Sequence, residues 1–341
     1  MTAGNELGGE EHGGATCTAG VLVVDKPKGP TSHDVVAVLR RALQTRQIGH
    51  CGTLDPMATG VLVVTVDEAT KLVPYLTADD KAYETTVRLG VGTDSLDAEG
   101  QETARQDVSE ELREALVSLE RGEACPAAIL DAIAIERARS EQVPPAFSAV
   151  RIGGERAHTM ARRGEAPELA ARPVALRSLE VRGGGIAPEP HLRLALDVTK
   201  GYFVRSLARD LSAGLGTVGH LTALRRTRSG GFTLDDALSL EGLWEKPTTK
   251  EAQLERRERL LARLLPMEQA VARAMPTLTL TDDGVRAARH GQRVRAADMS
   301  SSSGEAIVGT SAWLDASGKL VAIGEVSPEG SGQVLRGFVA G

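Results

Sequence analysis

The chain has 341 residues, of which 41% are hydrophobic and 25% charged, as in ordinary folded proteins. This composition argues against a collagen-like or largely disordered chain, and no apolar run approaches the ~18 to 20 residues that a membrane span needs. The net charge of −6 is unevenly spread, because residues 79–123 hold 13 acidic and 5 basic residues, while residues 200–228 hold 6 basic and 1 acidic. Such asymmetry lets one face attract a polyanion. Judged from charge alone, arginines that merely solvate helix faces are an equally good explanation.

The first 19 residues are rich in Gly, Glu and Thr, which predicts a disordered tail. They contain no Lys or Arg and so differ from secretory signals and transit peptides. We therefore expect a cytoplasmic protein that does not engage a membrane. The cysteines Cys17, Cys51 and Cys125 are too widely spaced for a disulfide framework or a zinc site, so we expect reduced thiols and no bound metal.

Order is predicted to begin with a strand, a turn and a helix. Residues 20–24 form a short apolar run, and residues 25–30 contain two prolines and a glycine, which is typical of a turn. Thr31 or Ser32 then caps a helix that runs to about Leu43. The adjacent Ser-His-Asp sequence is not a catalytic triad, because neighbouring residues cannot pass a proton along one line, and capping explains it better.

The glycine-rich loop over residues 49–60 precedes an apolar strand at residues 61–66 and contains Asp55. Pro56 stiffens the residue before it, and a carboxylate held rigidly beside a buried strand is well placed to act as a nucleophile or base. An aspartate that only hydrogen-bonds its own turn is the alternative. From the chemistry of this loop alone, an Asp55 that only stabilises its own turn is favoured over a catalytic Asp55.

The remaining elements follow from periodicity, caps and turn residues. Strands are predicted at residues 83–89, 147–152, 174–182 and 192–199. Helices are predicted at residues 109–119, 156–163, 204–215 and 247–265, the last with Leu254, Leu260, Leu261 and Leu264 on its apolar side. The first domain is expected to end at residue 265. Residues 276–341 have the pattern of a small β-rich, barrel-like module.

Six sequence blocks carry a family resemblance. They lie at residues 20–29, 49–62, 81–90 (followed by Thr93-Asp94), 143–149, 200–205 and 219–226. The most specific reads Gly-His-Cys-Gly-Thr-Leu-Asp-Pro-Met-Ala-Thr-Gly. In this order the blocks closely resemble the TruB family of tRNA pseudouridine-55 synthases. The resemblance implies an α/β (α+β) pseudouridine-synthase catalytic fold over residues 20–265, with a mixed, largely antiparallel sheet. The tail after residue 275 resembles an RNA-binding PUA module more weakly.

The resemblance also implies the reaction and its residues. Such an enzyme isomerises uridine to pseudouridine at position 55 in the T-loop of tRNA, without a cofactor or a metal. The catalytic residues are then Asp55, which acts on a flipped-out uridine, Arg205, which pairs with it and keeps it ionised, and Tyr83, which stacks on the base. Four further residues match substrate-binding positions: His50, Phe203, Leu224 and Lys26.

The implied partner is the T-arm of tRNA, with no obligate protein partner. Residues 149–173 resemble the family's mobile, RNA-contacting insert. Six arginines are expected to contact RNA, namely Arg151, Arg156, Arg162 and Arg163 of this insert, and Arg225 and Arg226. A basic cleft of this kind favours structured RNA over a free nucleotide.

Two departures from the family pattern leave alternatives open. Phe203 stands where the family usually has tyrosine, and Tyr202 precedes it. Because consecutive residues of an extended chain face opposite sides, only one of the pair is expected to line the site. The connection over residues 123–140 is longer than usual and is expected to be a surface helical excursion. A non-enzymatic RNA-binding protein is the main rival function, although the presence of both Asp55 and Arg205 argues against a dead site.

Overall fold

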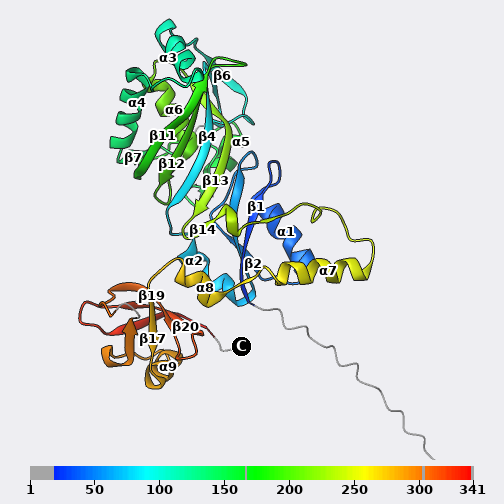
Figure 1. Cartoon of the computed structure of the whole chain (residues 1–341), viewed down its shortest axis with the longest axis vertical. Helices are drawn as coiled ribbons and strands as arrows, with labels where there is room; N and C mark the ends of the chain where they lie inside the picture. Colours follow the sequence, from blue (N-terminus) through cyan, green and yellow to red (C-terminus); the bar gives the residue numbers. More distant parts are fainter. Residues whose placement is uncertain (1–18, 166, 302–303, 339–341) are drawn as a thin grey trace, which may run out of the picture.

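The structure, a computed structural model, describes residues 19–165, 167–301 and 304–338. The predicted disordered tail therefore lies outside the described residues, apart from Ala19. A large sheet forms the middle of the molecule (Figure 1). Its strands are β1 (Gly20–Lys26), β2 (Ile48–Cys51), β3 (Thr59–Val66), β4 (Lys81–Leu89), β11 (Leu176–Gly185), β12 (His191–Val198), β13 (Gly219–Ser229), β14 (Phe232–Thr233), β15 (Leu238–Ser239) and β16 (Leu265–Pro266).

The order along the sheet is β11, β12, β4, β13, β3, β1 and β15, while β14 pairs with β13, β16 with β1, and β2 with β3. All of these pairs are antiparallel except β13 with β3 and β1 with β15. The expected mixed, largely antiparallel sheet is thus confirmed. Three two-stranded pairs lie apart from it. They are β5 (Val91–Thr93) with β6 (Glu102–Arg105), β7 (Glu141–Gln142) with β10 (Arg172–Pro173), and β8 (Arg151–Ile152) with β9 (Glu155–Arg156).

The central strands carry apolar side chains on both faces of the large sheet, because other elements pack against each face. Side chains alternate along a strand, so Leu22 and Val24 of β1 belong to one core and Val21 and Val23 to another. Five helices contribute to the first core: α1 (Ser32–Leu43), α3 (Glu110–Glu120), α4 (Ala127–Ala138), α6 (Val204–Gly214) and, through Leu260, α7 (Lys250–Leu261). The second core includes η1 (Asp67–Leu72), α2 (Val73–Leu76) and α8 (Met267–Ala272).

The capping prediction for α1 is confirmed at Thr31. The Thr31 hydroxyl accepts a hydrogen bond from the backbone N–H of Asp34, and the Asp34 carboxylate accepts one from the backbone N–H of Thr31. Ser32 has another task, because its hydroxyl accepts from the N–H of Leu54 at 2.9 Å and lies 3.2 Å from the Leu54 carbonyl oxygen. The first turn of α1 thereby anchors the loop that carries Asp55.

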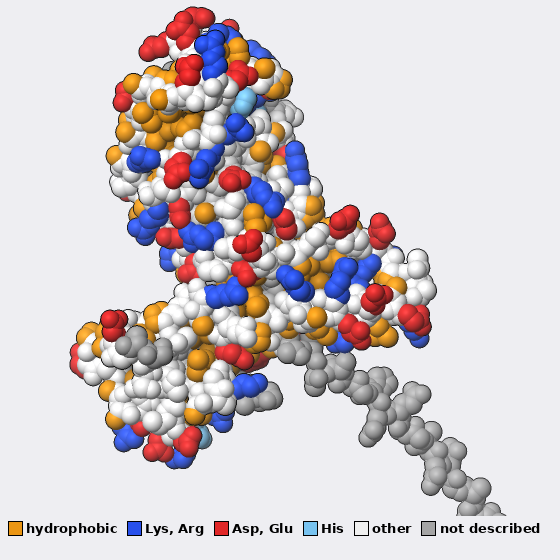
Figure 2. Space-filling view, viewed as in Figure 1, with side chains coloured by type: hydrophobic (Ala, Val, Ile, Leu, Met, Phe, Trp, Pro, Cys, Tyr) orange, Lys and Arg blue, Asp and Glu red, His pale blue; other side chains and the backbone are white. Residues whose placement is uncertain are grey.

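Two helix predictions need correction. The connection over residues 123–140 is no surface excursion, because α4 buries Ile129 and Ile133 against α6 and β11. The helix does expose Leu130 and Ile135, and Figure 2 shows an apolar area in the region of α4. The helix predicted at residues 247–265 is α7 (Lys250–Leu261), and it buries Leu260 but leaves Leu254 54% exposed. Within the described ranges, no helix is both long and apolar enough to cross a bilayer.

A separate five-stranded sheet follows α8 in the chain (Figure 1). Its order is β18 (Met299–Ser301), β17 (Thr277–Leu280), β19 (Gly309–Leu314), β20 (Leu320–Val326) and β21 (Gly332–Gly337), with α9 (Asp282–Arg289) packed against it. Trp313 is fully buried there, and a side chain at Gly324 would overlap its ring. Ala312, Leu320 and Ile323 join the second core of the large sheet. Because this shared core is apolar, we expect the two sheets to move as one unit.

Candidate active site

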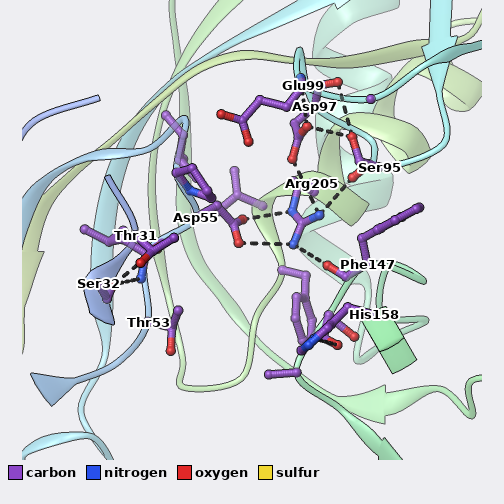
Figure 3. Close-up of a pocket in the computed structure, with 18 of the residues that line it drawn as sticks. Thr31, Ser32, Thr53, Asp55, Ser95, Asp97, Glu99, Phe147, His158 and Arg205 are labelled. Carbon is purple, nitrogen blue, oxygen red and sulfur yellow. Dashed lines mark hydrogen bonds and ion pairs between the residues drawn. The ribbon is translucent and has the colours of Figure 1, made fainter. Parts of the chain in front are cut away.

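A cavity of about 890 Å³ lies where several segments of the chain meet (Figure 3). The segments are the start of α1, the loop between β2 and β3, the turn after β5, the strands β4 and β13, residues 147–162 with α5 (Ala157–Arg162), and the start of α6. Seven of the residues singled out from the sequence line it: Asp55, Tyr83, Arg156, Arg162, Phe203, Arg205 and Leu224. Residues far apart in the chain thus converge on one space of the size that small-molecule sites usually have.

Asp55 and Arg205 form an ion pair at the wall of this cavity (Figure 3). Arg205 Nε lies 3.0 Å from Asp55 Oδ2, and Arg205 Nη2 lies 3.3 Å from Asp55 Oδ1, so the contact is bidentate. The other guanidinium protons are donated to the backbone carbonyls of Ser95 at 2.9 Å and Phe147 at 2.8 Å. The Arg205 side chain is 8% exposed and that of Asp55 34% exposed. Arg205 is therefore a fixed anchor that orients a carboxylate still open to the cavity.

The sequence analysis missed a second carboxylate on the same arginine. Asp97 Oδ2 lies 3.5 Å from Arg205 Nη1, and its Oδ1 accepts from the Ser95 hydroxyl at 2.6 Å. The Asp97 side chain is 5% exposed. A buried guanidinium has five N–H donors and needs more acceptors than one carboxylate supplies. The acidic stretch after Thr93 was the signal that could have identified this partner.

The balance of charges raises the pKa of the Asp55 carboxyl above its ordinary value. Desolvation inside the protein is the largest cause, the nearby Asp97 carboxylate adds to it, and Arg205 and Lys26 oppose it. The sequence-based view that Arg205 keeps Asp55 ionised therefore describes only one side of this balance. A carboxylate with a raised pKa is a stronger base, which suits a group that must act on a substrate.

Aromatic and apolar side chains form another wall of the cavity. Tyr83 from β4 and Leu224 from β13 are nearly buried, and these two strands are neighbours in the sheet. Both Tyr202 and Phe203 line the cavity, so the expectation that only one would do so is wrong. The pair lies in the turn before α6, where Phe203 is the N-cap residue, and the alternation of an extended strand does not apply.

Two residues expected to bind substrate are not among those that line the cavity. Lys26 is fully buried, and its ammonium group donates to the carbonyls of Pro27 at 2.9 Å, Pro30 at 2.7 Å and Pro56 at 3.3 Å. All three of its protons are therefore used to hold the Asp55 loop against the turn after β1, and burial lowers its pKa to about 8. His50 packs against His33, with the ring centroids 5.3 Å apart, and the histidines that line the cavity are His33 and His158.

The six arginines expected to contact RNA have different surroundings. Arg156 and Arg162 are exposed and line the cavity, and no acceptor for either is found among the described residues. The Arg163 guanidinium pairs with both Glu155 and Glu165, at 2.7 and 2.9 Å. Arg156 and Arg162 are therefore free to meet a ligand in the cavity, whereas Arg163 is held by two glutamates.

The remaining three arginines are engaged by the protein itself. Arg151 donates to the Gly154 carbonyl at 2.8 Å, and Arg225 forms a bidentate pair with Asp25 at 3.0 and 2.7 Å. Arg226 is 1% exposed and donates to the carbonyls of Val61 and Gly52. Arg226 is therefore buried and anchored by backbone carbonyls rather than displayed on the surface, because strand β13 turns this side chain inward.

Comparison with protein-family models places the site across two consecutive matches. Residues 40–204 match the model of the TruB family pseudouridylate synthase (N terminal domain). Residues 205–272 match that of the tRNA pseudouridylate synthase B C-terminal domain. Asp55 lies in the first matched region, and Arg205 is the first residue of the second. The cavity is thus assembled from both regions.

Similar curated proteins and solved structures agree with this match. The tRNA pseudouridine synthase B of Mycobacterium sp. (strain KMS) is 41% identical over 290 residues, 84% of this chain and 88% of the relative. That of Nocardia farcinica (strain IFM 10152) is 49% identical over 229 residues, 67% of this chain and 71% of the relative. The structure of a Cbf5-Nop10-Gar1 complex is similar in fold, with a TM-score of 0.64 and 24% identity over 94% of this chain and 84% of that chain. With these matches covering most of its length, the chain belongs to the TruB family of pseudouridylate synthases.

Proposed function

We propose that this protein isomerises uridine to pseudouridine at position 55 in the T-loop of tRNA, in the cytoplasm. The names of its relatives support the reaction class and the tRNA substrate. The observation that carries the proposal is the Asp55 carboxylate, held by a bidentate ion pair with Arg205 and open to a cavity that Tyr83 and Leu224 also line. A cavity of this size accepts one nucleotide taken out of its stack.

In the proposed reaction, the Asp55 carboxylate acts as nucleophile or base on the flipped-out uridine. The bond between N1 and C1′ breaks, the uracil turns in the cavity, and C5 forms a new bond to C1′. The proton leaves C5 and N1 takes up a proton, so every atom of uridine is retained. Tyr83 stacks on the base, and its hydroxyl assists removal of the C5 proton. Within this proposal, residues 276–341 serve as a PUA-like module that binds RNA.

The test is to incubate the purified protein with an unmodified tRNA transcript and to map pseudouridine by carbodiimide labelling and reverse transcription. We expect one modified site, at uridine 55, and none in a transcript with cytidine at that position. Binding of both transcripts without any modification would support the rival, a non-enzymatic RNA-binding protein. Modification at a different uridine would overturn the assignment of position 55.

The two free arginines of the cavity supply the next prediction. Replacing Arg156 and Arg162 together by Gln should weaken tRNA binding and lower the slope of log affinity against log salt by about 1.5, since each phosphate contact contributes ~0.7 to 0.9. The matched control is Arg113→Gln with Arg121→Gln, which removes two exposed charges whose ion pairs are long, at 3.7 and 3.9 Å. Equal slopes for the two double variants would show that Arg156 and Arg162 are solvated surface residues that do not contact phosphates.

The pair before α6 gives a further prediction. The Tyr202 hydroxyl is buried and has no partner among the described residues, so Tyr202→Phe should leave turnover unchanged and raise the free energy of unfolding by about 1 to 3 kcal/mol. Phe203→Tyr should keep turnover near that of the wild type, and Phe203→Ala should lower it through lost packing. Single-turnover rates and thermal melting check these variants. A Tyr202→Phe protein with normal stability and tRNA affinity but crippled turnover would make Tyr202 a catalytic residue.

A further inference from the structure

A second cavity, of about 470 Å³, lies beside the first and has the opposite charge. Three basic residues line it (Lys81, Lys200 and Arg226), and its lining contains no acidic residue. The first cavity is lined by four acidic residues (Asp55, Asp94, Asp97 and Glu99) together with three arginines (Arg156, Arg162 and Arg205). Thr53, Tyr83 and Tyr202 line both cavities, so these three residues form the partition between them. A ligand that extends past this partition meets both acidic and basic groups on one side and, among charged groups, only basic ones on the other.

The two buried cations of the second cavity lack a counter-ion. Lys81 is 8% exposed, and its ammonium group donates to the carbonyls of Thr77 at 3.2 Å and Asp79 at 2.6 Å. The third ammonium proton has no acceptor among the described residues. Arg226 donates through Nε and Nη2 to carbonyls, and its Nη1 has no partner within the described ranges. Neither residue forms an ion pair there, and the carboxylates of Asp79 and Asp80 act on Lys81 only from a distance.

Burying two positive charges side by side without an anion is costly, because each loses its hydration. The backbone between them is kept free of a side chain. A Cβ atom at residue 52 would stand 3.3 Å from Lys81 Cε and 3.4 Å from Arg226 Nη1, and Gly52 has a φ of +82°, which other residues rarely adopt. Lys200, which is exposed, adds a third charge to this cavity. The arrangement is that of a site for a small anion.

We infer that the second cavity binds a phosphate group of the RNA chain, next to the nucleotide held in the Asp55 cavity. This inference rests on the proposed function for the identity of the polymer. Beside Asp55 the only guanidinium of the described residues, that of Arg205, is already paired with Asp55 and Asp97, so this part of the first cavity suits an uncharged base better than a phosphate. Phosphate contacts fix the register of a nucleic acid on a protein. A phosphate on Lys81 and Lys200 thus sets which base passes the partition formed by Tyr83 and Tyr202.

The test combines protein variants with neutral phosphates. Lys200→Gln changes an exposed residue and should fold normally, and Lys81→Met removes the buried charge, with thermal melting as the check on folding. Each should lower the slope of log affinity for a T-arm hairpin against log salt by ~0.7 to 0.9. Lys250→Gln, an exposed lysine at the start of α7 outside both cavities, is the matched control and should leave the slope unchanged.

Methylphosphonates placed one at a time around the target nucleotide then locate the phosphate. In the wild-type protein, one of them should weaken binding by about tenfold or more, as expected for a lost hydrogen bond to a charged group. The same methylphosphonate should cost clearly less in Lys200→Gln than in the wild type, because this variant has already lost one of the contacts to that phosphate. If every neutral phosphate costs the same factor in both proteins, the inference is wrong.

Two further arms separate the possible outcomes. Inorganic phosphate that raises the melting temperature of the wild type but not of Lys200→Gln, without any coupling to a methylphosphonate, would assign the cavity to free phosphate and overturn the RNA assignment. Pseudouridine mapping with the wild type tests the enzyme independently. If one methylphosphonate is coupled to Lys200→Gln but no pseudouridine forms, this inference is retained and the proposed function is rejected. If pseudouridine forms without such coupling, the proposed function is retained and this inference is rejected.

Discussion

Asp55→Asn is expected to abolish pseudouridine formation while tRNA binding stays close to that of the wild type. Asparagine has the same shape and keeps the cavity filled, but it has no carboxylate to act on the nucleoside. Binding is spread over many phosphate contacts, so the loss of one carboxylate should affect the reaction alone. The measurement is the single-turnover rate with saturating enzyme, together with tRNA affinity by filter binding.

The control for this variant is Asp131→Asn, which makes the same change in charge on the exposed side of α4. Its rate should match the wild type. An Asp55→Asn rate within about tenfold of the wild type, equivalent to ~1.4 kcal/mol in activation free energy, would contradict the catalytic assignment.

Arg205→Met should damage both the reaction and the fold. The substitution leaves Asp97 buried without its charge partner and removes the donors to the carbonyls of Ser95 and Phe147. Removing one member of a buried ion pair usually costs ~3 to 5 kcal/mol of unfolding free energy. The rate should fall by about 10²-fold or more, since a misplaced catalytic group has an effect of that size. Urea unfolding and single-turnover kinetics measure the two effects.

The pH profile separates the two roles of Arg205. Because Arg205 lowers the pKa of the Asp55 carboxyl against the effect of burial, removing it raises that pKa further. The carboxylate form then persists only at higher pH, so the acid-side loss of activity should shift to higher pH in Arg205→Met. Arg205→Lys keeps a charge but cannot form two parallel hydrogen bonds, and its shift should be smaller. An unchanged acid limb in both variants would show that Arg205 only supports the fold.

Local patterns were sufficient to predict several elements, whereas the central residues of the candidate site were identified through the family resemblance. The apolar runs around Val23 and Val63 predicted two neighbouring buried strands, and the cap at Thr31 predicted the start of α1; the structure confirms all three. The blocks that contain Asp55 and Arg205 were recognised from sequence, and the structure brings these two side chains together. The two strands and the helix cap are predictable because turns, caps and apolar periodicity involve residues close together in the chain.

The surroundings of the charged groups were decided by the tertiary structure. Asp97 meets Arg205 from more than a hundred positions away, and Arg226 is buried because β13 pairs with β3 and turns it toward Gly52 and Val61. Tyr202 lines the cavity together with its neighbour because the pair lies between β12 and α6, outside any strand of the sheet. A sequence shows that a residue is an arginine, but the pairing register decides which carboxylate, carbonyl or solvent surrounds it. Desolvation and charge pairing depend on that surrounding, and they set the pKa of Asp55 and the exposure of every arginine predicted to bind RNA.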